Sequence, residues 1–177
     1  LDYYVTFDSK AVGALQAQYL VDHATGKGNP LYLYAGAATD PNSFIFFKGA
    51  WEVLQPRMAD GTFVTKNSSE AVALQDKSSL SHDEMTQIIS QVTTKWDAST
   101  ARILAESDLH VASESDKGDV FILAPNDNTA RAIGEVFAAD EHVKSHVITG
   151  QDAEEASILS IQDGRQSMTV FKDVRIL

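Results

Sequence analysis

The chain has 177 residues, 44% hydrophobic and 22% charged, which is enough for one globular domain with a substantial core and short for two. Its 14 Lys and Arg face 25 Asp and Glu, and the formal net charge of −11 argues against a general affinity for nucleic acid or an anionic membrane surface. The sequence has no cysteine, which excludes disulfides and thiolate metal sites, and no apolar run of about 18 residues that would span a membrane.

Short apolar runs alternate with helical periodicity along the whole chain. Strands are predicted over residues 3–7, 31–37, 62–65, 120–124, 145–149 and 167–171. Helices are predicted over residues 11–24, 43–58, 129–139 and 154–162, with two more that begin after Ser81 and after Asp97. This alternation, with strands that are apolar along most of their length, predicts a doubly wound α/β domain: a mostly parallel sheet with helices on both faces.

Several helix ends carry specific signals. Ser81 and Glu84 fit the S-x-x-E capping box, and apolar residues follow at i, i+3, i+4 and i+7 from Met85. Asp97 is predicted to cap the next helix, which runs to about residue 109. Gly61 and Gly164 are predicted to end the helices that precede them.

Polar side chains gather where the predicted strands end. In open parallel sheets, ligands bind beyond the carboxyl ends of the strands, near the point where strand order reverses. The segments expected at this edge are 38–42, 95–97, 125–128, 150–152 and 172–173, and they contain Asp40, Asn42, Trp96, Asn126, Asp152 and Lys172.

Helix capping is the simpler explanation for each Asn or Asp taken alone. We expect Asp40 or Asn42 to cap the helix near residue 43, and Asp127 or Asn128 to cap the helix at residue 129. One cap satisfies each helix, so the surplus is available to a ligand. On this argument Asn126 faces the ligand.

A sugar suits this set of side chains. Amides, carboxylates and a lysine match vicinal hydroxyls, which both donate and accept hydrogen bonds. An aromatic ring can cover the apolar face of a pyranose, and Trp96 is placed to do so. The alternative is a hydrophobic staple, but its partner would be Ala101, which is small.

Other chemistries are poorly supported. The sequence has no G-x-G-x-x-G, no P-loop and no G-x-S-x-G motif, and residues 25–28 fit a plain turn. His142 and His146 are four residues apart, but His146 falls in a predicted strand, so no metal site is expected. A phosphoacceptor role for Asp152 would need paired acidic residues after the first strand, where only Asp8 stands. No cofactor is implied.

Four segments resemble one family. ITGQDAEEASILSIQDGRQSMTVFKD (148–173), LAPNDNTARAIG (123–134), DYYVTFDSKAVGALQAQYLVD (2–22) and AGAATDPNSFIFFKGAWEVLQP (35–56) are similar to the xylose and multiple-monosaccharide receptors of ABC importers. These receptors are type 1 periplasmic-binding proteins, whose two α/β lobes are joined by three crossing strands and close on a sugar.

The resemblance implies that residues 1–177 form the C-terminal lobe alone, with inter-lobe crossing segments at 1–7 and 170–177 and with the other lobe and a signal sequence outside this chain. It also implies that the same six residues bind sugar: Asp40, Asn42, Trp96, Asn126, Asp152 and Lys172. Two departures stand out. Pro41 separates Asp40 from Asn42 where relatives usually have Asn, and the segment 67–94 is longer than in the better-known members.

The expected function is therefore that of a non-enzymatic, extracytoplasmic receptor, periplasmic or lipid-anchored. It would capture a monosaccharide such as xylose, glucose or galactose and deliver it to the permease of an ABC importer, without contact to nucleic acid. Two alternatives stay open. One is the sugar-effector domain of a transcription regulator, and the other is an α/β enzyme acting on a sugar, although no paired general acid and base is evident.

Overall fold

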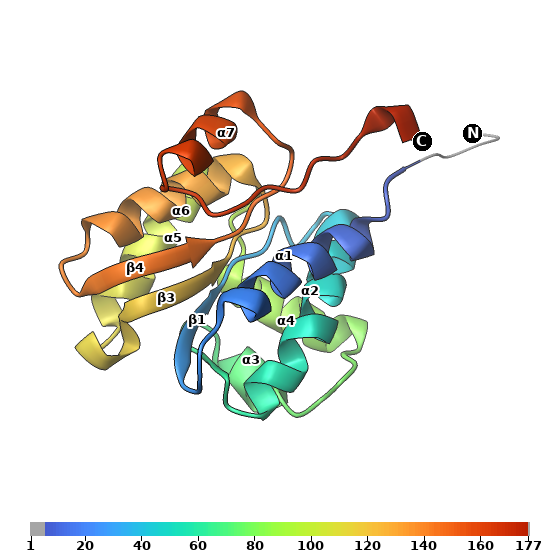
Figure 1. Cartoon of the computed structure of the whole chain (residues 1–177). Helices are drawn as coiled ribbons and strands as arrows, with labels where there is room; N and C mark the ends of the chain where they lie inside the picture. Colours follow the sequence, from blue (N-terminus) through green and yellow to red (C-terminus); the bar gives the residue numbers. More distant parts are fainter. Residues whose placement is uncertain (1–5, 177) are drawn as a thin grey trace.

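The computed structural model describes residues 6–176 and shows a four-stranded sheet between two layers of helices (Figure 1). The strands are β1 (Asn29–Leu33), β2 (Phe63–Thr65), β3 (Gly118–Leu123) and β4 (Val143–Ile148). They are all parallel, in the order β2-β1-β3-β4. The chain moves outward from β1 to β2 and then returns to the other side of β1, so strand order reverses between β1 and β3.

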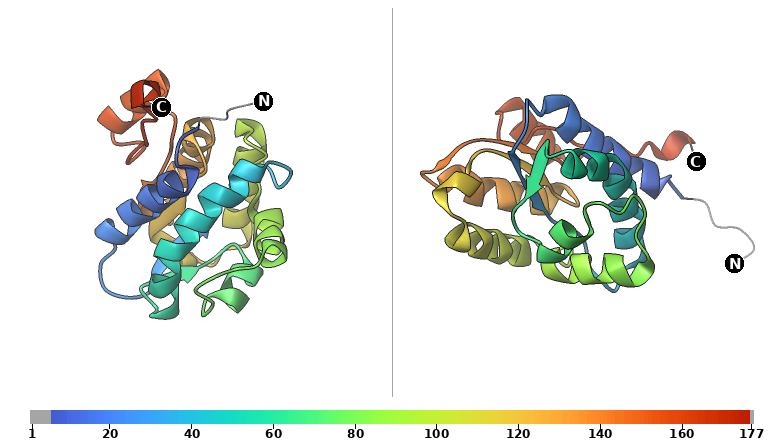
Figure 2. Two further views of the ribbon diagram at one scale, coloured as in Figure 1. Left: turned by 90° about the vertical axis from the view of Figure 1, so that its right-hand side faces the viewer. Right: turned by 90° about the horizontal axis from the view of Figure 1, so that it is seen from below.

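Helices cover both faces of this sheet (Figure 2). They are α1 (Ser9–His23), α2 (Pro41–Ala59), α3 (Ser69–Leu74), α4 (His82–Val92), α5 (Ala98–Val111), α6 (Asp127–Ala139) and α7 (Glu155–Gln162), with 3₁₀ turns η1 (Glu114–Asp116) and η2 (Val174–Ile176). The predicted doubly wound α/β class is confirmed.

Alternation along the central strands builds two separate cores. Successive residues of a strand point to opposite faces of the sheet. Leu31 and Leu33 pack in a cluster with α1, α2 and α4, whereas Tyr32 and Tyr34 pack in a second cluster with α5 and α6. The buried residues of β3 divide between the same two clusters. Because both faces are buried there, the buried parts of the central strands, residues 31–33 of β1 and 120–123 of β3, are apolar.

The helix signals predicted at Ser81, Asp97 and Gly61 are confirmed. Ser81 and Glu84 form both bonds of a capping box at the start of α4. Asp97 accepts a hydrogen bond of 2.7 Å from Thr100 N at the start of α5. Gly61 follows α2 with a φ of 77°, the left-handed conformation that glycine adopts without strain.

The strand predicted over residues 167–171 is wrong. Only Val170 makes a bridge there, to Gln151 beyond the end of β4. Asp152 and Ala153 have positive φ, which turns the partner segment away and prevents a ladder from extending. Residues 3–5 of the strand predicted over 3–7 lie outside the described residues, and Thr6 and Phe7 form no strand.

Two other elements differ from expectation. β1 ends at Leu33 instead of residue 37, because Ala35 is tied by an isolated bridge to Thr93 on the segment that returns to the sheet. Helix α3 was not predicted, although Ser68 accepts a hydrogen bond of 3.1 Å from Ala71 N as its cap. Its six residues are too few to carry a periodic signal.

Candidate functional site

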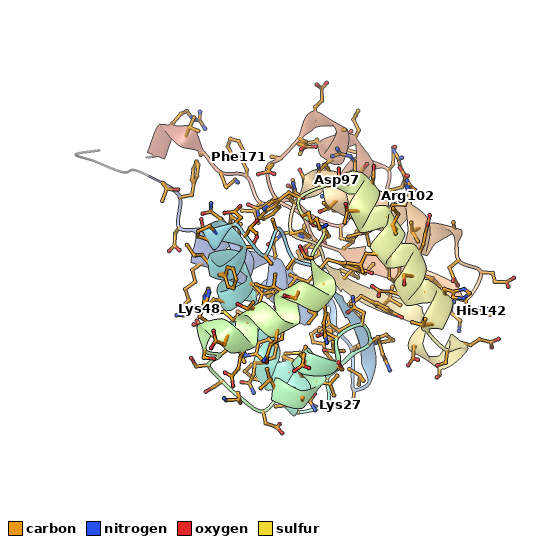
Figure 3. The ribbon with its side chains drawn as sticks, turned by 180° about the vertical axis from the view of Figure 1, so that it is seen from behind. Lys27, Lys48, Asp97, Arg102, His142 and Phe171 are labelled. Carbon is orange, nitrogen blue, oxygen red and sulfur yellow. The ribbon has the colours of Figure 1, made fainter. Side chains whose placement is uncertain are left out.

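A hollow of about 380 Å³ lies beyond the carboxyl ends of β1, β3 and β4, and we call it the rim hollow. Asp97 and Phe171 are the chain neighbours of Trp96 and Lys172, which line this hollow. Figure 3 shows Asp97 and Phe171 at one end of the molecule and Lys27 at the other. The structure places around this hollow all six residues that the family resemblance implied as sugar contacts: Asp40, Asn42, Trp96, Asn126, Asp152 and Lys172. Its position coincides with the reversal of strand order between β1 and β3, as open parallel sheets require.

Asp40 connects two of these residues. It is the N-cap of α2, and its Oδ1 accepts from Asn42 N at 2.9 Å and from Asn42 Nδ2 at 3.2 Å. Its Oδ2 accepts from Trp96 Nε1 at 3.0 Å. The predicted cap is therefore confirmed for Asp40, and the same carboxylate fixes the orientation of the indole.

The Trp96 ring rests on the backbone of Gly36. A Cβ on Gly36 would lie 2.1 Å from the indole, so only glycine admits the ring here. Phe46 on α2 packs against the indole edge to face, with ring centroids 6.1 Å apart. Trp96 contacts the α2 side of the hollow, and it is held there from three directions.

Each polar residue of the segment 126–128 has a separate role. Asn126, not Asp127 or Asn128, occupies the N-cap of α6, and it makes no side-chain bond to the helix amides. Its Oδ1 accepts from Thr129 Oγ1 at 2.7 Å, and its side chain lines the rim hollow. Asn128 donates Nδ2 to Trp96 O at 3.4 Å.

The expected cap at Asp127 or Asn128 is therefore wrong. Asp127 is fully buried and its carboxylate turns toward the loop after β4, where its oxygens accept hydrogen bonds from Glu154 N and Gln166 Nε2, each at 2.9 Å. Asp127 and Asn128 therefore do not cap the amides of α6, because partners outside the helix bind both of these side chains.

The opposite side of the rim hollow carries an ion pair. Lys172 Nζ lies 2.7 Å from Asp152 Oδ1, and both side chains are partly exposed to the hollow. Lys172 Nζ also lies 5.9 Å from the centroid of the Phe46 ring, at the outer limit of a cation–π contact. A cation and a carboxylate are thus presented side by side to a ligand.

Strained backbone is concentrated in the two loops that carry Trp96 and Asp152. Among residues 6–176, the non-glycine residues with positive φ are Lys95 at 55°, Trp96 at 61°, Asp152 at 103° and Ala153 at 52°. Such conformations cost about 1–3 kcal/mol each and gather at functional sites. Two of the four are residues proposed from sequence as ligand contacts.

Five further residues that line the same hollow were not among the predicted sugar contacts: Thr6, Phe7, Ser9, Phe46 and Gln151. Phe46 carried a usable signal, because it lies four residues after Asn42 and therefore on the same face of α2. Gln151 is next to Asp152, but its side chain is buried and its Nε2 donates to Pro125 O at 2.7 Å. Thr6 and Phe7 were assigned to a strand instead.

The arrangement offers hydrogen-bond donors and acceptors beside an aromatic ring. Across residues 6–176, no three His, Asp or Glu side chains come close enough together to hold a metal ion. No helix in that range is long and apolar enough to cross a bilayer. The donors, acceptors and aromatic ring of the rim hollow can pair with hydroxyls and cover an apolar ring face.

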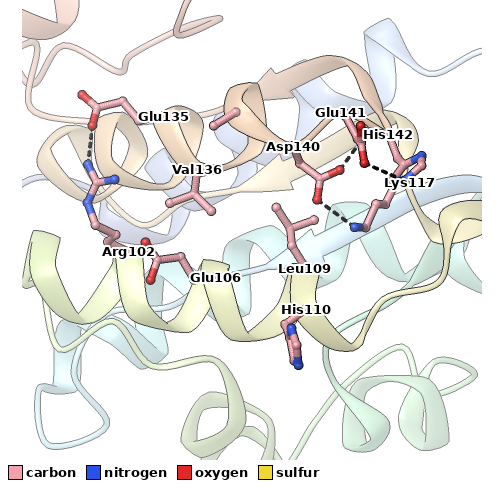
Figure 4. Close-up of a pocket in the computed structure, with 11 residues that line it drawn as sticks. Arg102, Glu106, Leu109, His110, Lys117, Glu135, Val136, Asp140, Glu141 and His142 are labelled. Carbon is pink, nitrogen blue, oxygen red and sulfur yellow. Dashed lines mark hydrogen bonds and ion pairs between the residues drawn. The ribbon is translucent and has the colours of Figure 1, made fainter.

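A larger hollow of about 780 Å³ lies elsewhere, between α5 and α6 near the amino end of β3, and we call it the α5–α6 groove (Figure 4). Both of its Lys and Arg side chains form ion pairs. Lys117 Nζ lies 2.7 Å from Asp140 Oδ2, and Arg102 pairs with Glu135. No aromatic rings except those of His110 and His142 are among its lining residues.

Together, the reversal of strand order and the polar, aromatic-bordered hollow define a ligand-binding lobe of the doubly wound α/β class. The chain belongs to the periplasmic-binding protein family, since the family model described as the periplasmic binding protein domain matches residues 1–177.

Two curated relatives are sugar receptors by name. The multiple sugar-binding periplasmic protein SbpA of Azospirillum brasilense is 34% identical over 185 residues, which cover 100% of this chain and 47% of that protein. The multiple sugar-binding periplasmic receptor ChvE of Rhizobium radiobacter is 33% identical and is covered over 48% of its length. The chain spans about half the length of these relatives.

Two solved structures are similar to the chain throughout. A carbohydrate transporter solute-binding protein from Chloroflexus aurantiacus, in complex with D-glucose, is 70% identical with a TM-score of 0.97, over 98% of this chain and 51% of that one. An ABC transporter solute-binding protein from Clostridium phytofermentans with bound β-D-glucose is 28% identical with a TM-score of 0.75, over 98% of this chain and 50% of that one.

Proposed function

We propose that this chain is one lobe of an extracytoplasmic receptor that captures a monosaccharide and delivers it to an ABC importer without transforming it. The observation that carries the proposal is the rim hollow, which gathers at the strand ends all six residues that the family resemblance implied. The glucose named in the two similar structures has the hydroxyl-rich chemistry that this hollow suits.

Each lining residue has a proposed role in holding the sugar. Trp96 covers the apolar face of the pyranose ring, and Asp40 orients the indole through its 3.0 Å bond to Nε1. Asn42 and Asn126 pair with hydroxyls through amide groups that both donate and accept. Asp152 and Lys172 exchange part of their mutual ion pair for hydroxyl contacts.

The rest of the receptor lies in the proposed second lobe. Residues 1–7 and 170–177 are proposed as crossing segments, and the C-terminal one runs away from the body of the lobe in Figure 1. Closure of two lobes on a sugar would be a population shift toward the liganded state. The names of the curated relatives support a periplasmic location, with a lipid anchor as the alternative.

Half of the contacts imply weak binding. If an intact receptor bound at about 1 μM, or about −8.2 kcal/mol, half of that free energy corresponds to about 1 mM. At that affinity 100 mM sugar stabilises the fold by about 2.7 kcal/mol. A domain of this size gains about 2–4 °C per kcal/mol, so the midpoint of thermal unfolding should rise by about 5–10 °C.

Thermal unfolding of the 177-residue chain with D-glucose, D-xylose, D-galactose and L-arabinose tests the proposal, with sorbitol at equal concentration as the solvent control. We expect at least one sugar to exceed sorbitol by several degrees, and Asp152→Asn to reduce the excess. The groove variant Glu106→Gln should retain it. A rise no larger than that with sorbitol for all four sugars would contradict the proposal, and conversion of the sugar would contradict its non-enzymatic part.

A further inference from the structure

The loop that follows β4, residues 150–154, has an anchor that lies outside the rim hollow. Gly150 begins the loop against a buried carboxylate: a Cβ on Gly150 would lie 2.3 Å from Asp127 Oδ1 and 2.5 Å from Gln166 Nε2. Any other residue would push Asp127 and Gln166 away. The loop therefore starts in contact with Asp127.

Hydrogen bonds fasten the loop at its other end and along its length. Asp127 Oδ2 accepts from Glu154 N at 2.9 Å, and Asp127 N donates to Gln151 O at 3.0 Å. Ala153 N donates to Thr169 Oγ1 at 3.1 Å, and Asp152 N donates to Val170 O at 3.1 Å. Asp127 thus contacts the loop on both sides of its two left-handed residues.

The loop needs such a restraint. Asp152 and Ala153 adopt φ of 103° and 52°, and non-glycine residues persist in such conformations only where their surroundings enforce them. Asp127 is 0% exposed, and a carboxylate that accepts bonds from a backbone amide and a side-chain amide is a strong restraint. Burial raises the pKa of Asp127, with a smaller contribution from the charge of Asp152, although the bonds from Gln166 and Glu154 N act in the opposite direction.

We propose that Asp127 is a positioning residue for sugar binding: it holds residues 150–154 in the strained conformation that presents Asp152, paired with Lys172, to the rim hollow. The inference rests on the proposed function. This positioning role explains why the Asp127 carboxylate is buried and does not cap α6. In the same segment Asn128 holds the Trp96 backbone, so the start of α6 organises both strained loops at once.

The test uses the 177-residue chain labelled with ¹⁵N and titrated with D-glucose. Asp127→Asn keeps the shape of the side chain but places an amide where two donors converge. We expect its dissociation constant to rise about tenfold, within the coupling range of residues that share one network. In an Asp152→Asn background the same change should cost less than twofold, because Asp127 acts through Asp152.

Asp108→Asn is the matched control. Asp108 is a half-buried carboxylate that accepts from Tyr34 Oη at 2.7 Å and from Asn67 Nδ2 at 3.0 Å, and it does not line the rim hollow. Its loss should lower the unfolding midpoint and leave the dissociation constant within twofold. Should Asp127→Asn fail to fold, Thr169→Val removes the acceptor of Ala153 N and tests the same loop.

Spectra without sugar separate this inference from the proposed function. If Asp127 holds the loop, Asp127→Asn shifts the amide signals of residues 150–154 and speeds hydrogen exchange at Glu154, and Asp108→Asn does neither. Unchanged loop amides would overturn the inference, and so would an equal loss of affinity in the Asp152→Asn background. Absence of any sugar-induced shift in the parent chain would count against the proposed function, while the sugar-free spectra would still decide the role of Asp127.

Discussion

The rim hollow and the α5–α6 groove differ in size and in chemistry, and the smaller one carries the candidate site. The groove has a volume of about 780 Å³ against about 380 Å³ for the rim hollow. Both of its Lys and Arg side chains, Arg102 and Lys117, form ion pairs with carboxylates that also line the groove. The rim hollow instead lies where strand order reverses, and its two loops contain the strained residues. The volume of a hollow therefore does not by itself identify a binding site, whereas polar side chains carried on strained backbone do.

The largest effect is expected from Trp96→Ala. This change removes the ring that would cover the sugar and leaves the Asp40 carboxylate without its 3.0 Å partner. Aromatic anchors of this kind contribute about 2 kcal/mol or more, so the dissociation constant should rise at least about 30-fold, beyond detection for this lobe. Trp96→Phe keeps a ring but lacks the indole N–H and should lie between the two. A titration in which Trp96→Ala binds glucose as tightly as the parent chain would contradict the assignment of the site to the rim hollow.

Gly36→Ala should be the next largest. The new Cβ would lie 2.1 Å from the Trp96 indole, and overpacking of this kind costs about 1–3 kcal/mol. Urea unfolding should show this loss of stability, and the sugar titration a loss of affinity, because the ring is displaced. The stability cost should fall in a Trp96→Ala background, where only the clash with Ser43 Oγ, 2.6 Å from the same Cβ, remains. Equal costs in both backgrounds would mean that the ring does not rest on Gly36.

A smaller effect concerns the pH dependence of stability. Burial raises the pKa of Asp127 in the folded protein above that of an unfolded aspartate, so the folded state binds more protons between the two pKa values. The contribution of Asp127 to the free energy of unfolding is therefore full below the unfolded pKa and is lost as pH rises through the folded pKa. Urea unfolding between pH 4 and pH 7 should show the stability of the parent relative to Asp127→Asn decreasing with pH. A constant or increasing difference would contradict the assignment.

The smallest effect is expected in the groove. Glu106→Gln changes a surface charge there, and substitutions of this kind usually alter stability by less than about 0.5 kcal/mol. Its unfolding midpoint and its dissociation constant for glucose should both match those of the parent. A clear loss of sugar affinity in this variant would move the site from the rim hollow to the groove.

The sequence predicted the elements whose signals are local. The capping box at Ser81, the glycine at 61 and the apolar β3 each follow from neighbouring residues, and the position of the site follows from strand ends. The failures are long-range. Residues 167–171 do not form a strand because the backbone bends at Asp152, which has a positive φ. No local sequence pattern predicts that bend.

The segment 126–128 shows the same limit at the level of single side chains. Asp and Asn at a helix start predict a cap, but the cap competes with any partner that folding brings near. Gln166 and the Glu154 amide hold Asp127, and Thr129 holds Asn126. Gln166 lies 39 residues away in sequence, so its bond could not be predicted from the segment itself.

The most direct test of the central claim is a chemical-shift map of the ¹⁵N-labelled 177-residue chain titrated with D-glucose into the millimolar range. The account predicts saturable shifts that gather around the rim hollow, at Asn42, Trp96, Asn126, Asp152 and Lys172, with none at Glu106, Glu135 or His142 in the α5–α6 groove. Saturable shifts confined to the groove would contradict it.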